Sequence, residues 1–171
     1  MVESDSDNKF GGLEMSENTS ATSNNERQLI LFALGKGNYG IPIENVFEIK
    51  KMGEITVVPK APKYIEGVIN LRGNVIPVID LRKRFGMEKI EYTKKTKTII
   101  VEVKKRQFGL IVDSVAEVVT LNQSQIELSL PTVSGLKAEF INGIGKLEDK
   151  LIIILDITRI LQSEEDIVIE E

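Results

Sequence analysis

Two groups of short apolar segments follow one another along the chain in the same order, and this repeat restricts the folds that the chain can adopt. Tyr39–Ile49 resembles Phe108–Val118 at an offset of 69 residues, and Leu71–Phe85 resembles Leu147–Leu161 at an offset of 76 residues. Chance similarity between β-rich stretches is the alternative, but the same order of motifs at nearly constant spacing favours a duplicated fold. We therefore predict two related small β modules, with one insertion in the second copy.

The segments have the composition of strands. They are short, rich in β-branched residues and separated by turn residues, which indicates an all-β barrel or sandwich. Short helical turns are expected only near 81–85 and 157–162, where Asp80 and Asp156 can cap the first turn. The predicted strands are Leu29–Leu34, Ile43–Ile49, Thr56–Val58, Val68–Leu71, Val75–Ile79, Thr98–Val103, Leu110–Val112, Val115–Leu121 and Leu151–Leu155.

The two ends of the chain differ from its middle. Residues 1–26 are rich in Ser, Asn, Asp, Glu and Thr, so they cannot bury enough apolar surface to offset the entropy of ordering. Residues 164–171 are mostly acidic and are expected to fray. The folded domain is therefore expected over 27–163, with the first repeat at 28–86 and the second at 97–162.

The composition removes most catalytic machinery. The 171 residues include no cysteine and no histidine, which excludes disulfides, thiolate and imidazole metal ligands, and nucleophiles activated by histidine. Neither G-x-x-x-x-G-K-[ST] nor G-x-G-x-x-G occurs, so nothing supports a phosphate cradle. We expect no enzyme, no cofactor and no metal site. A hydrolase with two carboxylates in a cleft stays open as an alternative, although the sequence singles out no such pair.

Charge and hydropathy bear on the partners. A net charge of −4 and an aromatic fraction of 5% argue against nucleic-acid binding, which favours a basic excess and stacking rings. The basic clusters at 82–84, 94–95 and 104–106 are typical of solvated faces. A small-barrel nucleic-acid binder that uses Arg82–Arg84 and Lys104–Arg106 is the alternative. No apolar run has the length of a membrane span and no signal peptide is evident, so we expect a cytoplasmic protein without membrane insertion.

One arginine lies where a plain scaffold would not require it. In Glu66–Gly86, EGVINLRGNVIPVIDLRKRFG, the residues at 71–74 interrupt two apolar runs and predict a tight turn with Arg72 at its tip. A solvated turn arginine is the plain interpretation. The second copy, however, has Glu148-Asp149 in place of Arg72-Gly73, and this asymmetry favours a functional role for Arg72.

Other positions recur in both copies, which favours a structural role. We expect the glycines to serve close turns, the valines to contact the core and the aspartates to cap helices. Glu48 also recurs, which favours a shared structural or surface role, although a contact with a partner stays open. The recurring pairs are Gly40 with Gly109, Val46 with Val115, Asp80 with Asp156, and Glu48 with Glu117.

Four stretches carry a resemblance to a known family. They are Gln28–Ile49, Ile55–Gly86, Thr98–Val118 and Phe140–Ile157, and they contain YGI, V-x-E-I, VP-x-x-P, GVINLRG and IPVIDLR in this order. The combination is highly specific, covers nearly all of the chain between the predicted tails, and resembles the bacterial chemotaxis coupling proteins of the CheW family. This resemblance implies two small five-stranded β-barrels, similar to SH3 or OB barrels, that share a hydrophobic core and exchange strands.

The resemblance also implies a function. Members of the family are non-enzymatic adaptors that join the cytoplasmic tips of chemoreceptors, the methyl-accepting chemotaxis proteins, to the histidine kinase CheA. The expected kinase partner is the regulatory domain of CheA, which is itself similar to this domain, and the expected location is the cytoplasm at receptor clusters on the inner face of the membrane. Because receptor tips are helical hairpins, we expect a helix to lie in a groove between the two barrels.

The receptor-binding residues follow from the same resemblance, whereas the kinase contact is not placed at the level of residues. Among the candidates, Arg72 and Glu48 can orient a helix through polar contacts. The valines have burial in the core as an alternative, and the glycines an unusual backbone conformation. The candidates are Val46, Glu48, Gly67, Arg72, Gly109, Val115 and Val118.

Overall fold

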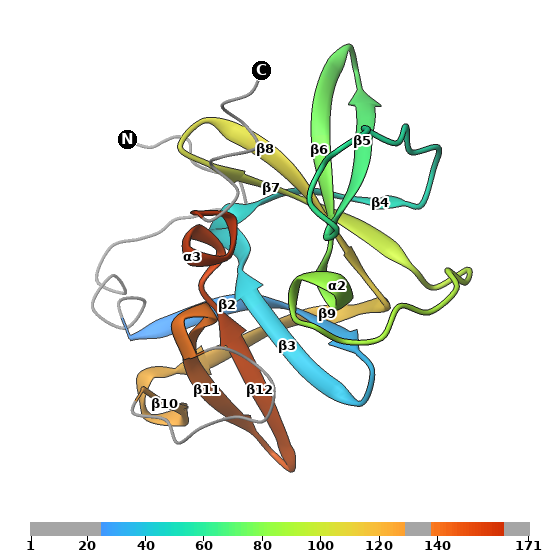
Figure 1. Cartoon of the computed structure of the whole chain (residues 1–171). Helices are drawn as coiled ribbons and strands as arrows, with labels where there is room; N and C mark the ends of the chain where they lie inside the picture. Colours follow the sequence, from blue (N-terminus) through green and yellow to red (C-terminus); the bar gives the residue numbers. More distant parts are fainter. Residues whose placement is uncertain (1–24, 129–137, 163–171) are drawn as a thin grey trace, which may run out of the picture.

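A computed structural model describes residues 25–128 and 138–162, which form two β-sheets with short helices at the level where the sheets meet (Figure 1). The five-stranded sheet has the order β4 (Val46–Lys51), β7 (Lys97–Val103), β8 (Arg106–Val112), β6 (Asn74–Asp80) and β5 (Ile65–Leu71). The six-stranded sheet has the order β10 (Ile126–Glu127), β11 (Ile141–Leu147), β12 (Lys150–Leu155), β3 (Gly37–Pro42), β2 (Glu26–Leu34) and β9 (Ser114–Asn122). The helices are α2 (Leu81–Arg84), α3 (Ile157–Gln162) and the 3-10 turns η2 (Ile43–Asn45), η3 (Gln123–Gln125) and η4 (Ala138–Phe140).

The predicted duplication is confirmed in the pairing of the strands. The order β4-β7-β8-β6-β5 in one sheet matches β9-β2-β3-β12-β11 in the other, strand by strand. The one parallel pairing in each sheet also matches, because Val78 lies opposite Gly109 in one and Ile154 lies opposite Gly40 in the other. The all-β fold class predicted from the sequence is thus confirmed.

Each sheet takes strands from both copies. The hairpin β2–β3 of the first copy lies in the sheet that holds β11 and β12, and the hairpin β7–β8 of the second copy lies between β4 and β6. The chain therefore leaves the six-stranded sheet between β3 and β4 and returns to it between β8 and β9.

Several details differ from the prediction. Gly37–Pro42 and Ile141–Leu147 are strands that the predicted set does not include, and Ile43–Asn45, predicted as the start of a strand, is a 3-10 turn. The run Thr56–Val58 is not a strand but contributes a single bridge, in which Thr56 pairs with Val68. Its counterpart in the second copy is β10, where Glu127 pairs with Ile144, and this short strand makes that sheet six-stranded instead of five-stranded. The number of residues that separates equivalent positions of the two copies is 69 at first, 71 between Thr56 and Glu127, and 76 from there on. The second copy therefore has two insertions and not the single one predicted. Closure of the sheets into barrels stays a prediction.

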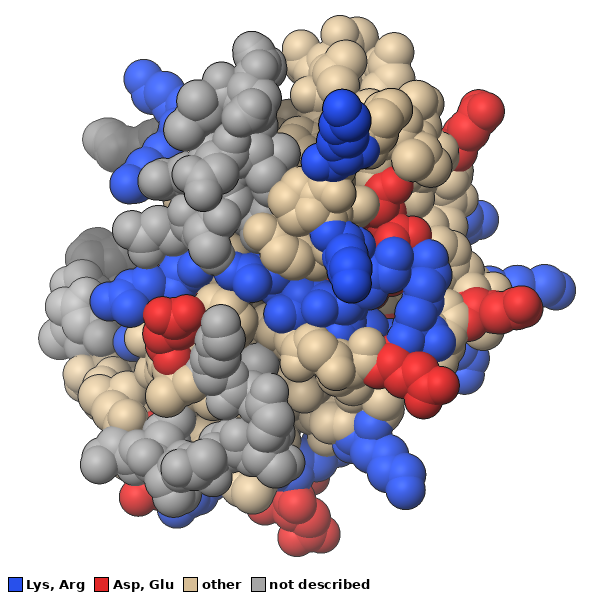
Figure 2. Space-filling model, viewed as in Figure 1, with Lys and Arg blue, Asp and Glu red and all other residues tan. Residues whose placement is uncertain are grey.

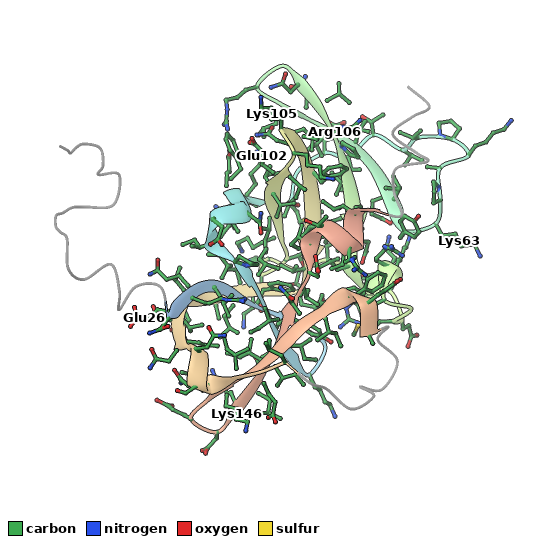
Figure 3. The ribbon with its side chains drawn as sticks, turned by 90° about the vertical axis from the view of Figure 1, so that its left-hand side faces the viewer. Glu26, Lys63, Glu102, Lys105, Arg106 and Lys146 are labelled. Carbon is green, nitrogen blue, oxygen red and sulfur yellow. The ribbon has the colours of Figure 1, made fainter. Side chains whose placement is uncertain are left out.

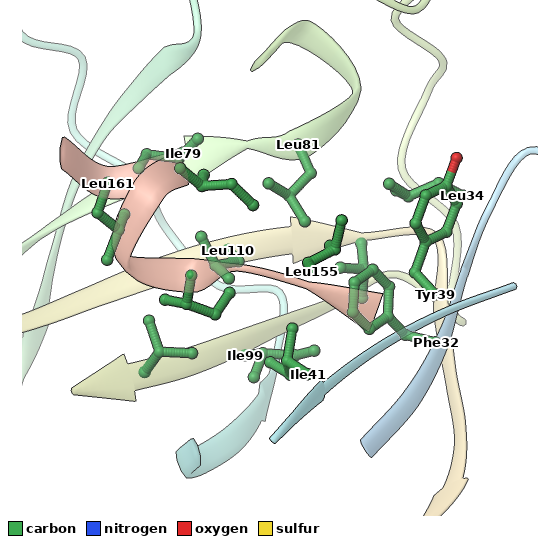
Figure 4. Close-up of a cluster of buried hydrophobic side chains, with 14 of the residues drawn as sticks. Phe32, Leu34, Tyr39, Ile41, Ile79, Leu81, Ile99, Leu110, Leu155 and Leu161 are labelled. Atoms are coloured by element: carbon green, nitrogen blue, oxygen red, sulfur yellow. The ribbon is translucent and has the colours of Figure 1, made fainter. Parts of the chain in front are cut away.

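The largest cluster of buried apolar side chains lies between the two sheets (Figure 4). The five-stranded sheet contributes residues such as Ile99 and Leu110, and the six-stranded sheet contributes Ile41 and Leu155. Four rings run through it in series, with centroid separations of 5.9 Å from Phe32 to Tyr39, 6.2 Å from Tyr39 to Phe85 and 5.8 Å from Phe85 to Phe140. These side chains join the two halves in one shared core.

Each sheet also curls around a smaller cluster of its own. In the five-stranded sheet, Leu71, Ile76 and Ile100 pack together although β5 and β7 are not neighbouring strands. In the six-stranded sheet, Leu29 and Leu31 pack with side chains of β9 and β12. The curl brings the outer strands of each sheet toward each other, which positions the site described below.

Both predicted helical turns are confirmed, together with their caps, but the prediction of no others is wrong, because the structure adds the 3-10 turns η2, η3 and η4. Asp80 Oδ1 accepts hydrogen bonds from the backbone N–H groups of Arg82 and Lys83, at 2.9 and 3.4 Å. Asp156 Oδ1 accepts one from the N–H of Arg159 at 3.1 Å. An aspartate at this place satisfies N–H groups that a helix start leaves without a partner.

The predicted tails lie largely outside the described residues, which begin at 25 and end at 162. Within the predicted N-terminal tail, Glu26 already belongs to β2 and pairs with Asn122. None of the helices in the described ranges is long and apolar enough to cross a membrane.

Candidate functional site

Arg72 lies at the tip of the hairpin that joins β5 to β6. Leu71 pairs with Asn74, so only Arg72 and Gly73 form the loop, and their φ angles are +50° and +89°. Two positive φ angles in succession are the mark of a type I′ turn, which fits the twist of the flanking strands. The N–H of Gly73 donates to Asn70 Oδ1 at 2.8 Å and fixes the turn.

The side chain of Arg72 reaches across to β4. Its Nη2 donates to Glu48 Oε1 at 2.5 Å, while 63% of the Arg72 side chain and 27% of the Glu48 side chain stay exposed. The hydrogen bond from Arg72 lowers the pKa of Glu48 from its ordinary value. Because β4 and β5 are the two outer strands of the five-stranded sheet, this ion pair bridges the edges that the curl brings together. The structure thus joins two of the residues that the sequence singles out.

The turn itself does not require an arginine. Glu148 occupies the equivalent position in the second copy and has nearly the same backbone angle, with a φ of +56°. The residue equivalent to Glu48 is Glu117, so the second copy places two carboxylates where the first places an ion pair. The two ends of the molecule therefore share a backbone and differ in charge.

Gly67 and Gly109 are both buried, and neither has room for a side chain. Gly67 has a φ of +152° at an irregularity of β5, and a Cβ there would overlap the carbonyl oxygen of Thr56. A Cβ on Gly109 would lie 2.9 Å from Cγ2 of Thr98 and 3.3 Å from Cγ2 of Val78. These contacts explain why both positions require glycine, and the explanation needs no contact with a binding partner.

The three candidate valines divide by burial. Val46 on β4 and Val115 on β9 are half-buried and pack against the central cluster, as their equivalence in the repeat predicts. Val118 on β9 is 47% exposed and stays accessible to a partner.

Sequence reasoning missed two exposed apolar residues on β4. Phe47 is 50% exposed and Ile49 is 39% exposed, and they flank Glu48 on an outer strand. The repeat contained a signal for one of them, because Ile49 is the counterpart of the candidate Val118. An exposed phenylalanine beside an exposed isoleucine at a sheet edge marks a surface suited to a protein partner.

The basic cluster of α2 is engaged inside the molecule. Arg82 pairs with Asp113, Lys83 pairs with Glu66, and Arg84 donates to the carbonyl oxygen of Ile160. Figure 2 shows Lys and Arg side chains gathered across the middle of the face that Figure 1 also presents, with Asp and Glu side chains beside them. The three cations at 82–84 are therefore not free to bind phosphates, which argues against the alternative of a nucleic-acid binder.

The carboxylate of Glu66 accepts a second group of hydrogen bonds. Burial by itself would raise its pKa, but hydrogen bonds from Lys83, Lys89 and Tyr92 outweigh the effect and lower the pKa. Tyr92 also donates to Asp80 Oδ2 at 3.2 Å, so the segment after α2 is tied back to β5 and β6. In the described part of the chain, no three His, Cys, Asp or Glu residues are grouped so as to hold a metal ion.

Comparison with known proteins gives a consistent result. The sequence model of the CheW-like domain family matches residues 28–165. The chain is 38% identical over 137 residues to the chemotaxis protein CheW of Bacillus subtilis, with 80% of this chain and 88% of that protein covered. It is 35% identical over 139 residues to the chemotaxis protein CheW of Klebsiella aerogenes, with 81% and 84% covered.

The fold agrees with a solved relative. The crystal structure of the scaffolding protein TtCheW from Thermoanaerobacter tengcongensis superimposes with a TM-score of 0.72 at 43% sequence identity, and the match covers 76% of this chain and 88% of that one. The duplicated sheets, the family match and the relatives point to one conclusion: the chain belongs to the CheW-like domain family, a family of chemotaxis scaffold proteins.

Proposed function

We propose that this protein is a non-enzymatic adaptor that couples the cytoplasmic tips of chemoreceptors to the histidine kinase CheA. The observation that carries the proposal is β4 at the edge of the five-stranded sheet, which holds Glu48 of the Arg72–Glu48 ion pair and, before and after it in sequence, the exposed Phe47 and Ile49. A receptor tip is a helical hairpin, and an amphipathic helix binds through apolar anchors that a few charges orient. Coupling then requires no chemistry, because a module that holds two partners raises their effective concentration.

Within this proposal the candidate residues take different roles. Glu48, Arg72 and Val118 offer side chains to the receptor, since all three are at least partly exposed. Val46 and Val115 support the strands from the core side. The two glycines offer no side chain and allow the close packing of their neighbours.

Arg72→Glu is expected to weaken binding of a receptor-tip hairpin by about 1–3 kcal/mol, the range for losing one anchoring contact. The melting temperature is expected to stay nearly unchanged, because an exposed ion pair contributes at most about 1 kcal/mol to stability. Calorimetric titration with the hairpin and thermal denaturation of the same sample measure both quantities.

A charge-swapped variant separates two explanations of such a loss. Glu48→Arg combined with Arg72→Glu restores the ion pair with its ends reversed. If binding stays weak, Arg72 contacts the receptor itself; if binding recovers, the pair acts by holding the turn to β4. Arg106→Glu, at the exposed first residue of β8, is the matched control and is expected to bind normally. Unfolding of Arg72→Glu would instead assign Arg72 a structural role.

For the kinase we propose the exposed aliphatic positions that recur in both copies. Val75 and Leu151 are equivalent and are 70% and 60% exposed, and Val57 and Leu128 are equivalent and are 74% and 60% exposed. A kinase domain that resembles this one would offer similar surfaces, which supports pseudo-symmetric pairing between the two domains.

Val75→Asp and Leu151→Asp are expected to weaken binding to the regulatory domain of the kinase by about tenfold, since each places a charge in an apolar contact. Neither change is expected to affect folding, because both side chains are largely exposed. Surface plasmon resonance with the immobilised kinase domain measures the effect, with Ile90→Asp, at a 39% exposed residue elsewhere, as the control. Normal binding by both variants would exclude these positions.

A further inference from the structure

Arg82 and Asp113 form a two-point ion pair where the two sheets meet. Arg82 Nε donates to Asp113 Oδ1 at 2.9 Å and Nη2 donates to Oδ2 at 2.7 Å, and the side chains are only 13% and 21% exposed. The same Oδ2 accepts the backbone N–H of Gly35 at 2.7 Å. Arg82 Nη1 donates to the carbonyl oxygen of Glu88 at 2.8 Å. A forked pair of this kind fixes both distance and orientation.

The pair connects segments that belong to different sheets. Arg82 is in α2, directly after β6 of the five-stranded sheet. Asp113 is the residue between β8 and β9, where the chain passes from that sheet to the six-stranded one. Gly35 is in the turn between β2 and β3 of the six-stranded sheet. Two residues beyond Asp113, Val115 begins the part of β9 that carries the candidate surface.

The repeat shows that the fold can be built without this pair. The equivalent change of sheet, between β3 and β4, has Glu44 in the place of Asp113 and Thr158 in the place of Arg82. Thr158 carries no charge, and Glu44 is exposed. The connection between β8 and β9 is therefore held by a two-point ion pair, whereas the equivalent connection between β3 and β4 is not, although the strand order around both is the same.

We propose that Arg82 and Asp113 are a positioning pair, which holds β9 and its exposed Val118 in a set place relative to the five-stranded sheet and to the Arg72–Glu48 pair. The proposal rests on the proposed receptor function, because it makes the spacing between β9 and β4 a determinant of receptor binding. Hydrogen bonds from Arg82 lower the pKa of Asp113, so the carboxylate stays charged at neutral pH.

The placement of the two sheets relative to each other, which sets the spacing between β9 and β4, can be measured directly, since the chain contains no native cysteine. Arg106→Cys in the five-stranded sheet and Lys146→Cys in the six-stranded sheet place two spin labels at exposed sites on opposite ends of the molecule (Figure 3). Pulsed double electron–electron resonance of the full chain gives the distance distribution between them. We expect one narrow distribution in the parent, and a broader, shifted one with Arg82→Met, Arg82→Lys or Asp113→Asn.

Lys83→Met is the matched control. It removes a cation from the same helix, but its partner Glu66 lies in the same sheet, so the distance distribution is expected to stay narrow. Arg82→Lys keeps the charge and cannot form the fork, so it decides the question if Arg82→Met does not fold. An unchanged distribution in a folded Arg82→Lys or Asp113→Asn would overturn the proposal.

The binding measurements separate this proposal from the function on which it rests. In folded Arg82→Lys and Asp113→Asn, the affinity for the receptor-tip hairpin is expected to fall by about tenfold. Circular dichroism at the assay temperature is expected to show a fully folded protein, whereas a merely destabilised protein would lose affinity only in proportion to its unfolded fraction. A changed distance with unchanged receptor affinity would refute the functional part. If the parent does not bind the hairpin, the proposed function fails, and the distances still decide whether the pair positions the sheet that contains β9.

Discussion

Phe32→Ala is expected to lower the free energy of unfolding by about 3–5 kcal/mol, the usual cost of removing a buried aromatic ring. Phe32 is 1% exposed and begins the series of rings that crosses the central cluster. The loss combines the transfer free energy of the ring with the cavity that its neighbours cannot fill. Against a total stability of about 5–15 kcal/mol, this is a large fraction. Urea denaturation followed by circular dichroism measures it.

Phe47→Ala is the matched control, because Phe47 is 50% exposed on β4. We expect that change to cost no more than about 1 kcal/mol. Since the central cluster takes side chains from both sheets, Phe32→Ala should also lower the stability of the two halves together in one transition. Equal losses in the two variants, or separate transitions for the two halves, would refute the shared core.

Gly67→Ala is expected to destabilise the protein by about 3 kcal/mol, since the change forces either a strained backbone or a shift of the neighbouring chain. A methyl group there would overlap the carbonyl oxygen of Thr56, which accepts a hydrogen bond from the N–H of Val68 at 2.8 Å. The φ of +152° adds strain for any residue with a Cβ. Receptor binding is then expected to fall only as the folded fraction falls.

Two further glycines calibrate this result. Gly53→Ala should change stability by less than about 0.5 kcal/mol, because no heavy atom lies within 4 Å of its added Cβ. Gly143, the counterpart of Gly67, has a φ of +153°, but its nearest neighbour is a side-chain methyl at 3.0 Å, so Gly143→Ala should cost less than Gly67→Ala. A stable Gly67→Ala that no longer binds the receptor hairpin would show instead that Gly67 belongs to the contact surface.

The site was predictable in part. The asymmetry between Arg72 and Glu148 marked Arg72, and the recurrence of Glu48 as Glu117 marked the glutamate, but neither pattern shows that the two side chains meet. Their contact depends on the curl of the sheet, which brings β4 to the turn after β5. The ion pair between Arg82 and Asp113 could not be predicted for a similar reason. The two residues are 31 positions apart, and their local sequences indicate only the start of a helix and the end of a strand.

The sequence by itself determined the repeat and most of its strands, the tight turn at Arg72 and the two helices capped by aspartate, because these depend on alternation, β-branching and residues a few positions apart. The tertiary structure alone decided which hairpin enters which sheet. Both copies have the same apolar pattern, so β2–β3 and β7–β8 would satisfy either sheet, and local sequence does not distinguish the two. That choice depends on burial and charge pairing among residues distant in the chain, including the central rings and the Arg82–Asp113 fork.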